Sequence, residues 1–218
     1  MAEGQKAKAQ AVVIAVDGPA ASGKGTLASH LAEHFGFRHL DTGGLYRAVA
    51  ARMLRLGDNP ADEIVCEMAA KNLEDQDRKS PNLRAEEVGK IASVVSAHPP
   101  VRAALLVYQR AYASVPPGAV LDGRDIGTVV CPDANGKIYL DASVEARAKR
   151  RVKELRLRGV ESIESRVLQE MQDRDARDSG RAVAPLRAAE DALRIDTTGL
   201  TPDEVFDQAL NYLAERLE

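Results

Sequence analysis

A glycine-rich segment between a predicted strand and a predicted helix constrains the fold of this chain more than any other feature. Residues 11–17 form a Val- and Ile-rich run typical of a buried strand, and the apolar positions of residues 24–35 recur at helical spacing. Between them lies Gly18-Pro19-Ala20-Ala21-Ser22-Gly23-Lys24-Gly25-Thr26. This order predicts a P-loop, in which backbone N–H groups, a helix N-terminus and Lys24 bind the phosphates of ATP.

The loop departs from the usual P-loop pattern directly after its lysine. Gly25 stands where a Ser or Thr is common, and Thr26 follows it. We therefore expect no direct protein ligand for Mg²⁺, which ATP would carry into the site. The sequence contains neither an NKxD-type guanine reader nor an LSGGQ-like transport signature. Together with the Lys-Gly-Thr ending, these absences favour a small-molecule kinase.

The rest of the chain alternates between predicted strands and predicted helices. Further strands are expected at residues 37–40, 119–122, 137–140 and 192–195, and helices at 45–56, 61–72, 85–97, 101–113, 144–158 and 163–177. A last helix follows Thr201, where Pro202 and Glu204 predict a capping box. Residues 73–82 are polar and predict an exposed loop. The pattern predicts an α/β fold, with a mainly parallel five-stranded sheet flanked by helices.

Composition narrows the class of protein further. The 218 residues carry a net charge of −3 and only 4% aromatic side chains, which argues against a nucleic-acid partner. No apolar run approaches the roughly 20 residues of a membrane helix, so no membrane partner is expected. Cys66 and Cys131 lack CxxC partners, and we interpret them as reduced thiols of a cytoplasmic protein. We expect a disordered tail at residues 1–10 and a single, monomeric domain at residues 11–218.

Three further segments carry a specific resemblance. They are LDTGGLYR at residues 40–47, LDGRDIGTVV at residues 121–130 and RDARDSGRAVAPL at residues 174–186. With the phosphate loop, they closely resemble the bacterial cytidylate kinase family over about residues 11–218. The resemblance implies a P-loop kinase core and transfer of the γ-phosphoryl group of ATP to CMP and dCMP. The products would be CDP or dCDP and ADP, in pyrimidine nucleotide metabolism.

The resemblance also implies a reader for the cytosine edge, made of Ser93, Arg102 and Asp125. Cytosine presents an amino donor beside two acceptors, which suits a carboxylate with Arg and Ser donors. Uracil would place an acceptor against Asp125 and leave a buried charge without its donor. We therefore expect this site to discriminate between the two bases.

The remaining expected site residues surround the phosphates. The resemblance implies acceptor-side contacts from Thr42, Arg47 and Arg84, with Arg47 on the CMP phosphate. Arg174 and Asp178 would contact the ribose and the reacting phosphates, and Arg181 would belong to a phosphate clamp. The expected catalytic set is Lys24, Arg124, Arg174 and Arg181.

Two expectations come from local patterns. Asp122 ends a predicted strand and is either a carboxylate near the hydrated Mg²⁺ or a turn residue before Gly123. Arg174, Arg177 and Arg181 are spaced by three and four residues, so they would share one side of a helix that continued this far.

Two mobile parts are expected from the resemblance. Family members carry a small β-sheet in the acceptor-binding insert, but residues 73–82 are too polar and too short to form one. The insert, at about residues 57–99, is therefore predicted to be trimmed and mostly helical. A short lid is expected at about residues 152–166.

Other functions remain open from the sequence. A related P-loop kinase could act on UMP, AMP or shikimate, and a non-catalytic module could bind nucleotide to regulate a partner. Two protease-like strings are rejected: His-x-x-Glu-His at residues 30–34 lies on the predicted P-loop helix, and Asp41-Thr42-Gly43 lies in an α/β pattern.

Overall fold

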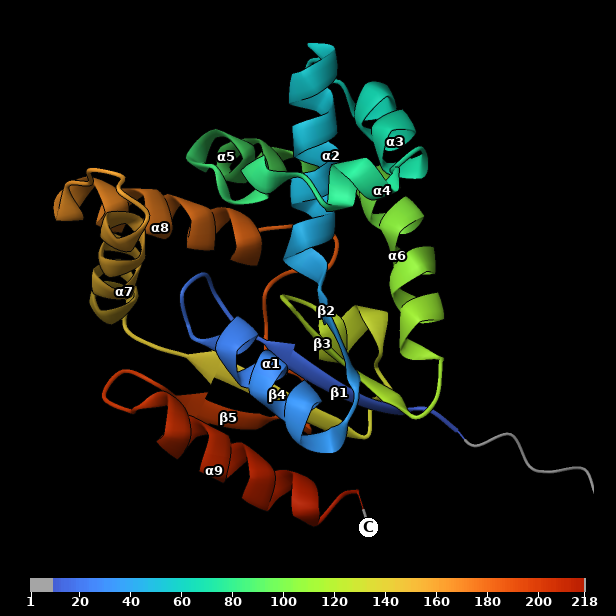
Figure 1. Cartoon of the computed structure of the whole chain (residues 1–218), viewed down its shortest axis with the longest axis vertical. Coiled ribbons are helices and arrows are strands. Elements are labelled where there is room, and N and C mark those ends of the chain that lie inside the picture. The colour runs from blue at the N-terminus through green and yellow to red at the C-terminus, as the bar shows by residue number, and fades with distance from the viewer. Residues whose placement is uncertain (1–9, 218) are drawn as a thin grey trace, which may run out of the picture.

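A central parallel sheet organises the computed structural model, which describes residues 10–217. Its strands are β1 (Val12–Asp17), β2 (Arg38–Asp41), β3 (Gly118–Gly123), β4 (Gly136–Asp141) and β5 (Leu193–Asp196). They are hydrogen-bonded in the order β2-β3-β1-β4-β5, and every neighbouring pair is parallel (Figure 1). The predicted α/β fold with a five-stranded sheet is confirmed.

Helices cover both faces of the sheet, as the alternation of side chains along β1 requires. Ile14 and Val16 pack with α1 (Lys24–Phe35) and α9 (Pro202–Ala214). Ala15 points to the other face and packs with α2 (Thr42–Leu56), α3 (Glu63–Lys71) and α6 (Pro99–Ala113). The carboxyl ends of the parallel strands meet at one edge of the sheet, below α2, α7 and α8 in Figure 1.

Helix α2 begins at Thr42, three residues before the predicted start at residue 45. Asp41 is its N-cap, and the Asp41 carboxylate accepts a hydrogen bond of 3.0 Å from the N–H of Gly44. The Asp-Thr-Gly string is thus a strand end followed by a helix cap. Helix α6 also begins earlier than predicted, at Pro99, because proline suits the first helical turn.

The prediction of an exposed loop at residues 73–82 is wrong. This segment contains the short helix α4 (Asp75–Arg78) and the start of the 3₁₀ helix η1 (Pro81–Arg84). Asp77 is buried and bonds Arg52 at 3.0 Å and Arg55 at 2.6 Å, both on α2. The following helix is α5 (Glu86–Val95). All five strands of the described residues belong to the central sheet, so the predicted insert is helical there.

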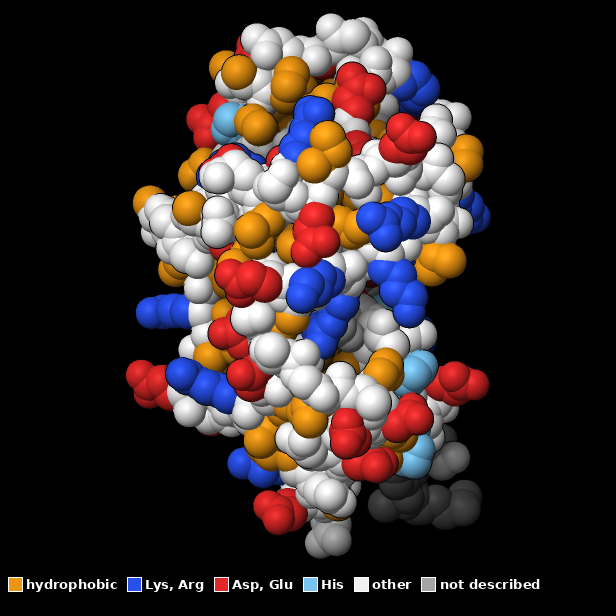
Figure 2. All heavy atoms as spheres, turned by 90° about the vertical axis from the view of Figure 1, so that its left-hand side faces the viewer, with side chains coloured by type: hydrophobic (Ala, Val, Ile, Leu, Met, Phe, Trp, Pro, Cys, Tyr) orange, Lys and Arg blue, Asp and Glu red, His pale blue; other side chains and the backbone are white. Residues whose placement is uncertain are grey.

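A helical hairpin, α7 (Val144–Leu157) and α8 (Glu164–Ser179), rises beside the sheet (Figure 1). Its own small core contains Ala148, Val152 and Met171. Acidic and basic side chains are interspersed over the side of the molecule on which the hairpin lies (Figure 2). Helix α8 ends at Ser179 with Gly180 as its C-cap, so Arg181 lies beyond the helix. The condition for Arg174, Arg177 and Arg181 to share one helix side is therefore not met.

The remaining expectations concern the ends of the chain and the membrane. The capping box of Thr201 and Glu204 is present at the start of α9 and is confirmed. The tail expected at residues 1–10 lies outside the described residues, apart from residue 10. Within residues 10–217 no single helix is long and apolar enough to cross a membrane, although α5 and α6 reach that length and composition together across a bend of 101°.

Candidate active site

The phosphate loop needs glycine at its first position. A Cβ on Gly18 would lie 2.2 Å from the carbonyl oxygen of Leu140 on β4, so the loop can leave β1 only without a side chain there. Gly23, the N-cap of α1, has a φ of 94°, which also favours glycine. The loop between them turns the chain from the sheet into α1.

The first turn of α1 is left open to an anion. In the described structure it has neither a side-chain cap nor an acidic residue, unlike the capped α2 and α9. Its N–H groups and positive helix end therefore face the loop without a competing carboxylate. Lys24 Nζ donates to the Pro19 carbonyl at 3.2 Å. Burial and the nearby Arg124 lower the pKa of Lys24 to about 7.

One cleft of about 860 Å³ opens above this loop. It is bounded by the phosphate loop, the start of α2, α5 and α8. The predicted site residues that line it are Ala20, Ala21, Lys24, Gly25, Arg47, Arg84, Ser93, Asp122, Arg124 and Arg174. The other predicted loop residues do not border it, namely Gly18, Pro19, Ser22, Gly23 and Thr26. Five other predicted site residues do not line the cleft: Thr42, Arg102, Asp125, Asp178 and Arg181.

Asp178 gathers the arginines at one side of the cleft. Its carboxylate is 2.9 Å from Arg124 Nε and 2.5 Å from Arg181, with Arg174 Nε at 3.9 Å. Burial, followed by the repulsion of Arg124, lowers the pKa of Arg174 to about 10. The Nε atom of Arg174 is buried and has no hydrogen-bond partner in the described structure. The single carboxylate leaves this group of guanidinium ions with excess positive charge, which an anionic substrate can offset.

Arg102 and Asp125 form a buried ion pair of 2.5 Å that does not itself line the cleft. Arg102 also donates to the Ser96 carbonyl at 3.2 Å, which fixes the guanidinium. Ser93 is nearby on α5, and its hydroxyl accepts from Arg177 Nε at 3.3 Å. These three predicted base contacts therefore come from α5, from α6 and from the segment that follows β3.

Asp122 lies inside β3 and borders the cleft, which rules out its reading as a turn residue. His39 Nε2 lies 2.7 Å from Asp122 Oδ1, and this hydrogen bond raises the pKa of His39. Thr42 Oγ1 donates to the Asp122 carbonyl at 2.7 Å. The partnership of His39 with Asp122 was missed, since nothing in the sequence shows that β2 and β3 are neighbours.

Arg47 on α2 and Arg84 in the predicted insert both line the cleft. Arg47 donates to the Leu83 carbonyl at 3.1 Å and lies against Gly89 of α5, where a Cβ would be only 3.2 Å from its guanidinium. Burial lowers the pKa of Arg47. The Arg84 carbonyl accepts from Arg158 of the hairpin at 2.8 Å.

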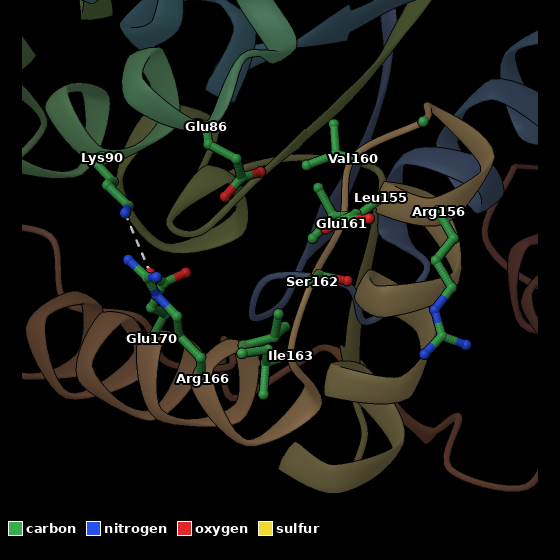
Figure 3. Close-up of a pocket in the computed structure, with 12 residues that line it drawn as sticks. Glu86, Lys90, Leu155, Arg156, Val160, Glu161, Ser162, Ile163, Arg166 and Glu170 are labelled. Carbon is green, nitrogen blue, oxygen red and sulfur yellow. Dashed lines mark ion pairs between the residues drawn. The ribbon is translucent and has the colours of Figure 1, made fainter.

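Ion pairs link α5 of the predicted insert to the α7–α8 hairpin beside a second pocket of about 810 Å³. Figure 3 shows Lys90 on α5 facing Glu170 on α8, at 3.2 Å. Arg151 on α7 also bonds Glu86 at the start of α5. Arg151 lines the main cleft. It could not be predicted from the sequence, because one arginine among many on a charged helix carries no distinguishing signal.

Arg147 is a second missed residue. It is buried, pairs with Asp175 at 2.7 Å, and donates to the Ala142 carbonyl at 2.9 Å and to the Ala20 carbonyl of the phosphate loop at 3.4 Å. It thus connects both helices of the hairpin to the loop. Its only sequence signal is its place on the apolar side of α7 with Ala148 and Val152.

The donor set suits a magnesium ion that arrives with a nucleotide. Among the described residues no group of three His, Cys, Asp or Glu side chains could hold a metal ion. Asp122 supplies one carboxylate beside the loop, since a Cβ on Gly25 would be 4.0 Å from its Oδ2. Mg²⁺ is commonly held by one or two carboxylates, waters and substrate phosphates, which fits this arrangement.

Comparisons with known proteins agree with this geometry. The family model described as Cytidylate kinase matches residues 14–215. A cytidylate kinase from Paramagnetospirillum magneticum is 51% identical over 94% of this chain and 98% of its own. Another from Rhodospirillum rubrum is 52% identical with the same coverage of both chains.

Solved structures support the fold alone. A gluconokinase from Sinorhizobium meliloti superposes with a TM-score of 0.51 at 16% identity, over 94% of this chain and 92% of the other. An uncharacterised protein from Eubacterium ventriosum superposes with a TM-score of 0.54 at 16% identity, over 94% of this chain and 99% of the other. The family model and the relatives at about half identity establish that the chain belongs to the cytidylate kinase family.

Proposed function

We propose that this protein transfers the γ-phosphoryl group of ATP to CMP and dCMP, giving ADP and CDP or dCDP. One observation carries the proposal: Lys24 of the phosphate loop lines the same cleft as Arg47, Arg124 and Arg174. A donor triphosphate on the loop and an acceptor phosphate on the arginines would then meet within one cavity.

The reaction needs positioning and charge neutralisation rather than a base. The acceptor oxygen belongs to a phosphate that is already anionic at neutral pH, so no side chain has to remove a proton. Lys24 and the N-terminus of α1 would hold the donor, while Arg124, Arg174 and Arg181 offset the charge of the transferring group. Mg²⁺ bound to ATP would supply further charge neutralisation between its phosphates, with Asp122 at its hydration shell.

Specificity for cytosine would come from the buried pair of Arg102 and Asp125, with Ser93. Arg102 holds the Asp125 carboxylate in place, so it can accept from the amino group of cytosine. Arg47 and Arg84 would bind the acceptor phosphate, and Thr42 would shape the site through its bond to the Asp122 carbonyl. Asp178 would contact the ribose while holding the surrounding arginines.

Two segments would close over the substrates. We propose residues 57–99 as the acceptor-binding insert and residues 152–166 as the lid of a single domain. The hydrogen bond from Arg158 in the proposed lid to the Arg84 carbonyl in the proposed insert supports their joint movement. Closure would exclude water and so favour transfer over hydrolysis of ATP. Because one chain supplies the whole cleft, we propose that the monomer is active. The free thiols Cys66 and Cys131 suit a reducing cytoplasm.

A panel of acceptors tests the proposed function. ADP release from ATP is measured with CMP, dCMP, UMP, AMP and shikimate, each at equal concentration. We expect rapid release with CMP and dCMP, and none above the hydrolysis background with AMP or shikimate. Nucleotide binding without acceptor-dependent ADP release would contradict the proposal and favour a regulatory module.

A further inference from the structure

Asp17 is a buried carboxylate to which the proposed reaction assigns no role. It is the last residue of β1, directly before Gly18, and only 4% exposed. Its two oxygens accept one hydrogen bond each, from the N–H of Ile126 and the N–H of Gly127, both at 2.8 Å. Both N–H groups follow Asp125 directly in the chain.

The hydrogen bonds from Ile126 and Gly127 to Asp17 stand in for the bonds that the Asp125 side chain could make to the same N–H groups. Residues Ile126–Val130 form a single π-helical turn (η2), and Asp125 occupies its N-cap position. An aspartate at an N-cap usually accepts from the first N–H groups of the turn. In the described structure Asp125 makes no such bond and instead pairs with Arg102 at 2.5 Å. Asp17 therefore caps the turn and leaves the Asp125 carboxylate available for the base.

The surroundings allow this segment little movement. The Ile126 side chain is fully buried. A Cβ on Gly127 would lie 3.3 Å from Lys137 Cδ and 3.5 Å from Asp17 Oδ2, so the backbone is closely enclosed. Burial raises the pKa of Asp17 to about 7 even though both N–H donors oppose it. An aspartate here is costly for folding, which is expected where the position serves a site.

We propose that Asp17 is a positioning residue that fixes the backbone behind Asp125 and thereby sets the discrimination between cytosine and uracil. The inference rests on the proposed function, because it assigns Asp125 to the base. Asp17 directly precedes Gly18, the first residue of the phosphate loop. It therefore connects the backbone behind the base-binding residues to the donor site.

The test compares Asp17→Asn with Glu204→Gln. Asparagine keeps the size but turns an N–H₂ group towards one of the two backbone donors, so one bond is lost. Glu204 is the control, since its carboxylate also accepts two hydrogen bonds, from the N–H and the hydroxyl of Thr201, but it caps α9 away from the cleft and from the proposed insert. We expect Asp17→Asn to lower the ratio of kcat/KM for CMP to that for UMP by about 10-fold. The KM for ATP should change by less than about 2-fold, and Glu204→Gln should leave the ratio unchanged.

A second variant and a second measurement cover the case in which Asp17→Asn does not fold. Gly127→Ala crowds the same contact from the other side and should lower the ratio in the same direction. Hydrogen exchange at the amides of Ile126 and Gly127 should be slow in the wild-type protein and faster in either variant. An unchanged ratio in a folded variant, or rapid wild-type exchange at both amides, overturns the inference. Failure of the wild-type protein to release ADP with CMP would instead contradict the proposed function, while the exchange measurement still decides whether Asp17 fixes this backbone.

Discussion

Asp178 holds Arg124 and Arg181 at 2.9 and 2.5 Å, with Arg174 at 3.9 Å, beside one wall of the cleft. A guanidinium held by a buried carboxylate keeps its geometry before any substrate arrives. Such preorganised charges stabilise a transferring phosphoryl group without reorganising during the reaction. The same carboxylate also limits the repulsion among the arginines, so its loss should affect both stability and rate.

Arg181→Ala should lower kcat more than it lowers stability. Arg181 donates to Asp178 and to the Ser96 hydroxyl at 2.8 Å, and its charge belongs to the proposed phosphate clamp. We expect kcat for CMP to fall by about 100-fold, as for the loss of a charged transition-state contact. Steady-state kinetics and urea unfolding measure the two effects. Arg38→Ala is the control, because Arg38 donates to the Tyr112 and Val115 carbonyls and should affect stability alone. Equal losses of kcat in both variants would remove Arg181 from the clamp.

Lys24 should take up a proton when ATP binds. Its pKa of about 7 means that at pH 8 most of the free protein carries neutral Lys24. A bound triphosphate favours the charged form and raises this pKa, so binding near pH 8 takes up protons and ATP affinity falls as the pH rises above 7. Calorimetric titrations in buffers of different ionisation enthalpy measure the uptake. Lys24→Met should abolish it, and an equal uptake in that variant would refute the assignment.

At the scale of elements, the sequence predicts best where a local signal decides the structure. Strand β1, the glycine-rich loop after it and the capping box of Thr201 each depend on residues that are neighbours in the chain, and all three are found as predicted. The short helix α4 and the π turn after Asp125 were not predicted. Each is held by a carboxylate that is distant in sequence from its partner, Asp77 with Arg52 and Asp17 with Ile126. Such contacts leave no local pattern of apolar residues.

Asp77→Asn tests whether α4 is held by its buried ion pairs. Burial alone would raise the pKa of Asp77, but the Glu74 N–H, Arg55 and Arg52 lower it. A lowered pKa means that this stabilisation is present above the ordinary pKa of an unfolded aspartate and is lost as the pH falls through the folded pKa. We expect the substitution to lower the free energy of unfolding at pH 7 by about 2 kcal/mol, and by progressively less as the pH falls below the ordinary pKa of aspartate.

The neighbouring Asp75 supplies the control for α4. It is exposed and pairs with Arg78 on the same short helix. Asp75→Asn should leave the free energy of unfolding nearly unchanged in the same urea titrations. If the two variants were equally stable at pH 7, the link between α4 and α2 would be incidental.

At the scale of the whole molecule, the parallel sheet decides where the site lies. All five strands of the described residues end at one edge, so the phosphate loop after β1, Asp41 at the end of β2 and Asp122 in β3 are neighbours there. Helices α2 and α5 form one wall of the cleft above this edge, and the α7–α8 hairpin forms another. The sequence predicted the sheet and part of the cleft lining, including Lys24, Arg47 and Arg124. It did not predict Arg151 or the pairs that link α5 to the hairpin, because they depend on how the two walls are placed.

The binding of a bisubstrate ligand tests the facing pockets most directly. In this ligand adenosine and cytidine are joined through a chain of five phosphates, and its Kd is measured by calorimetry beside those of ATP and CMP. If donor and acceptor pockets share one cleft, the ligand should bind at least about 100-fold more tightly than either nucleotide, since the second contact becomes intramolecular. Lys24→Met and Arg124→Ala should each weaken it strongly. A bisubstrate ligand that bound no more tightly than ATP alone would contradict the single-cleft account.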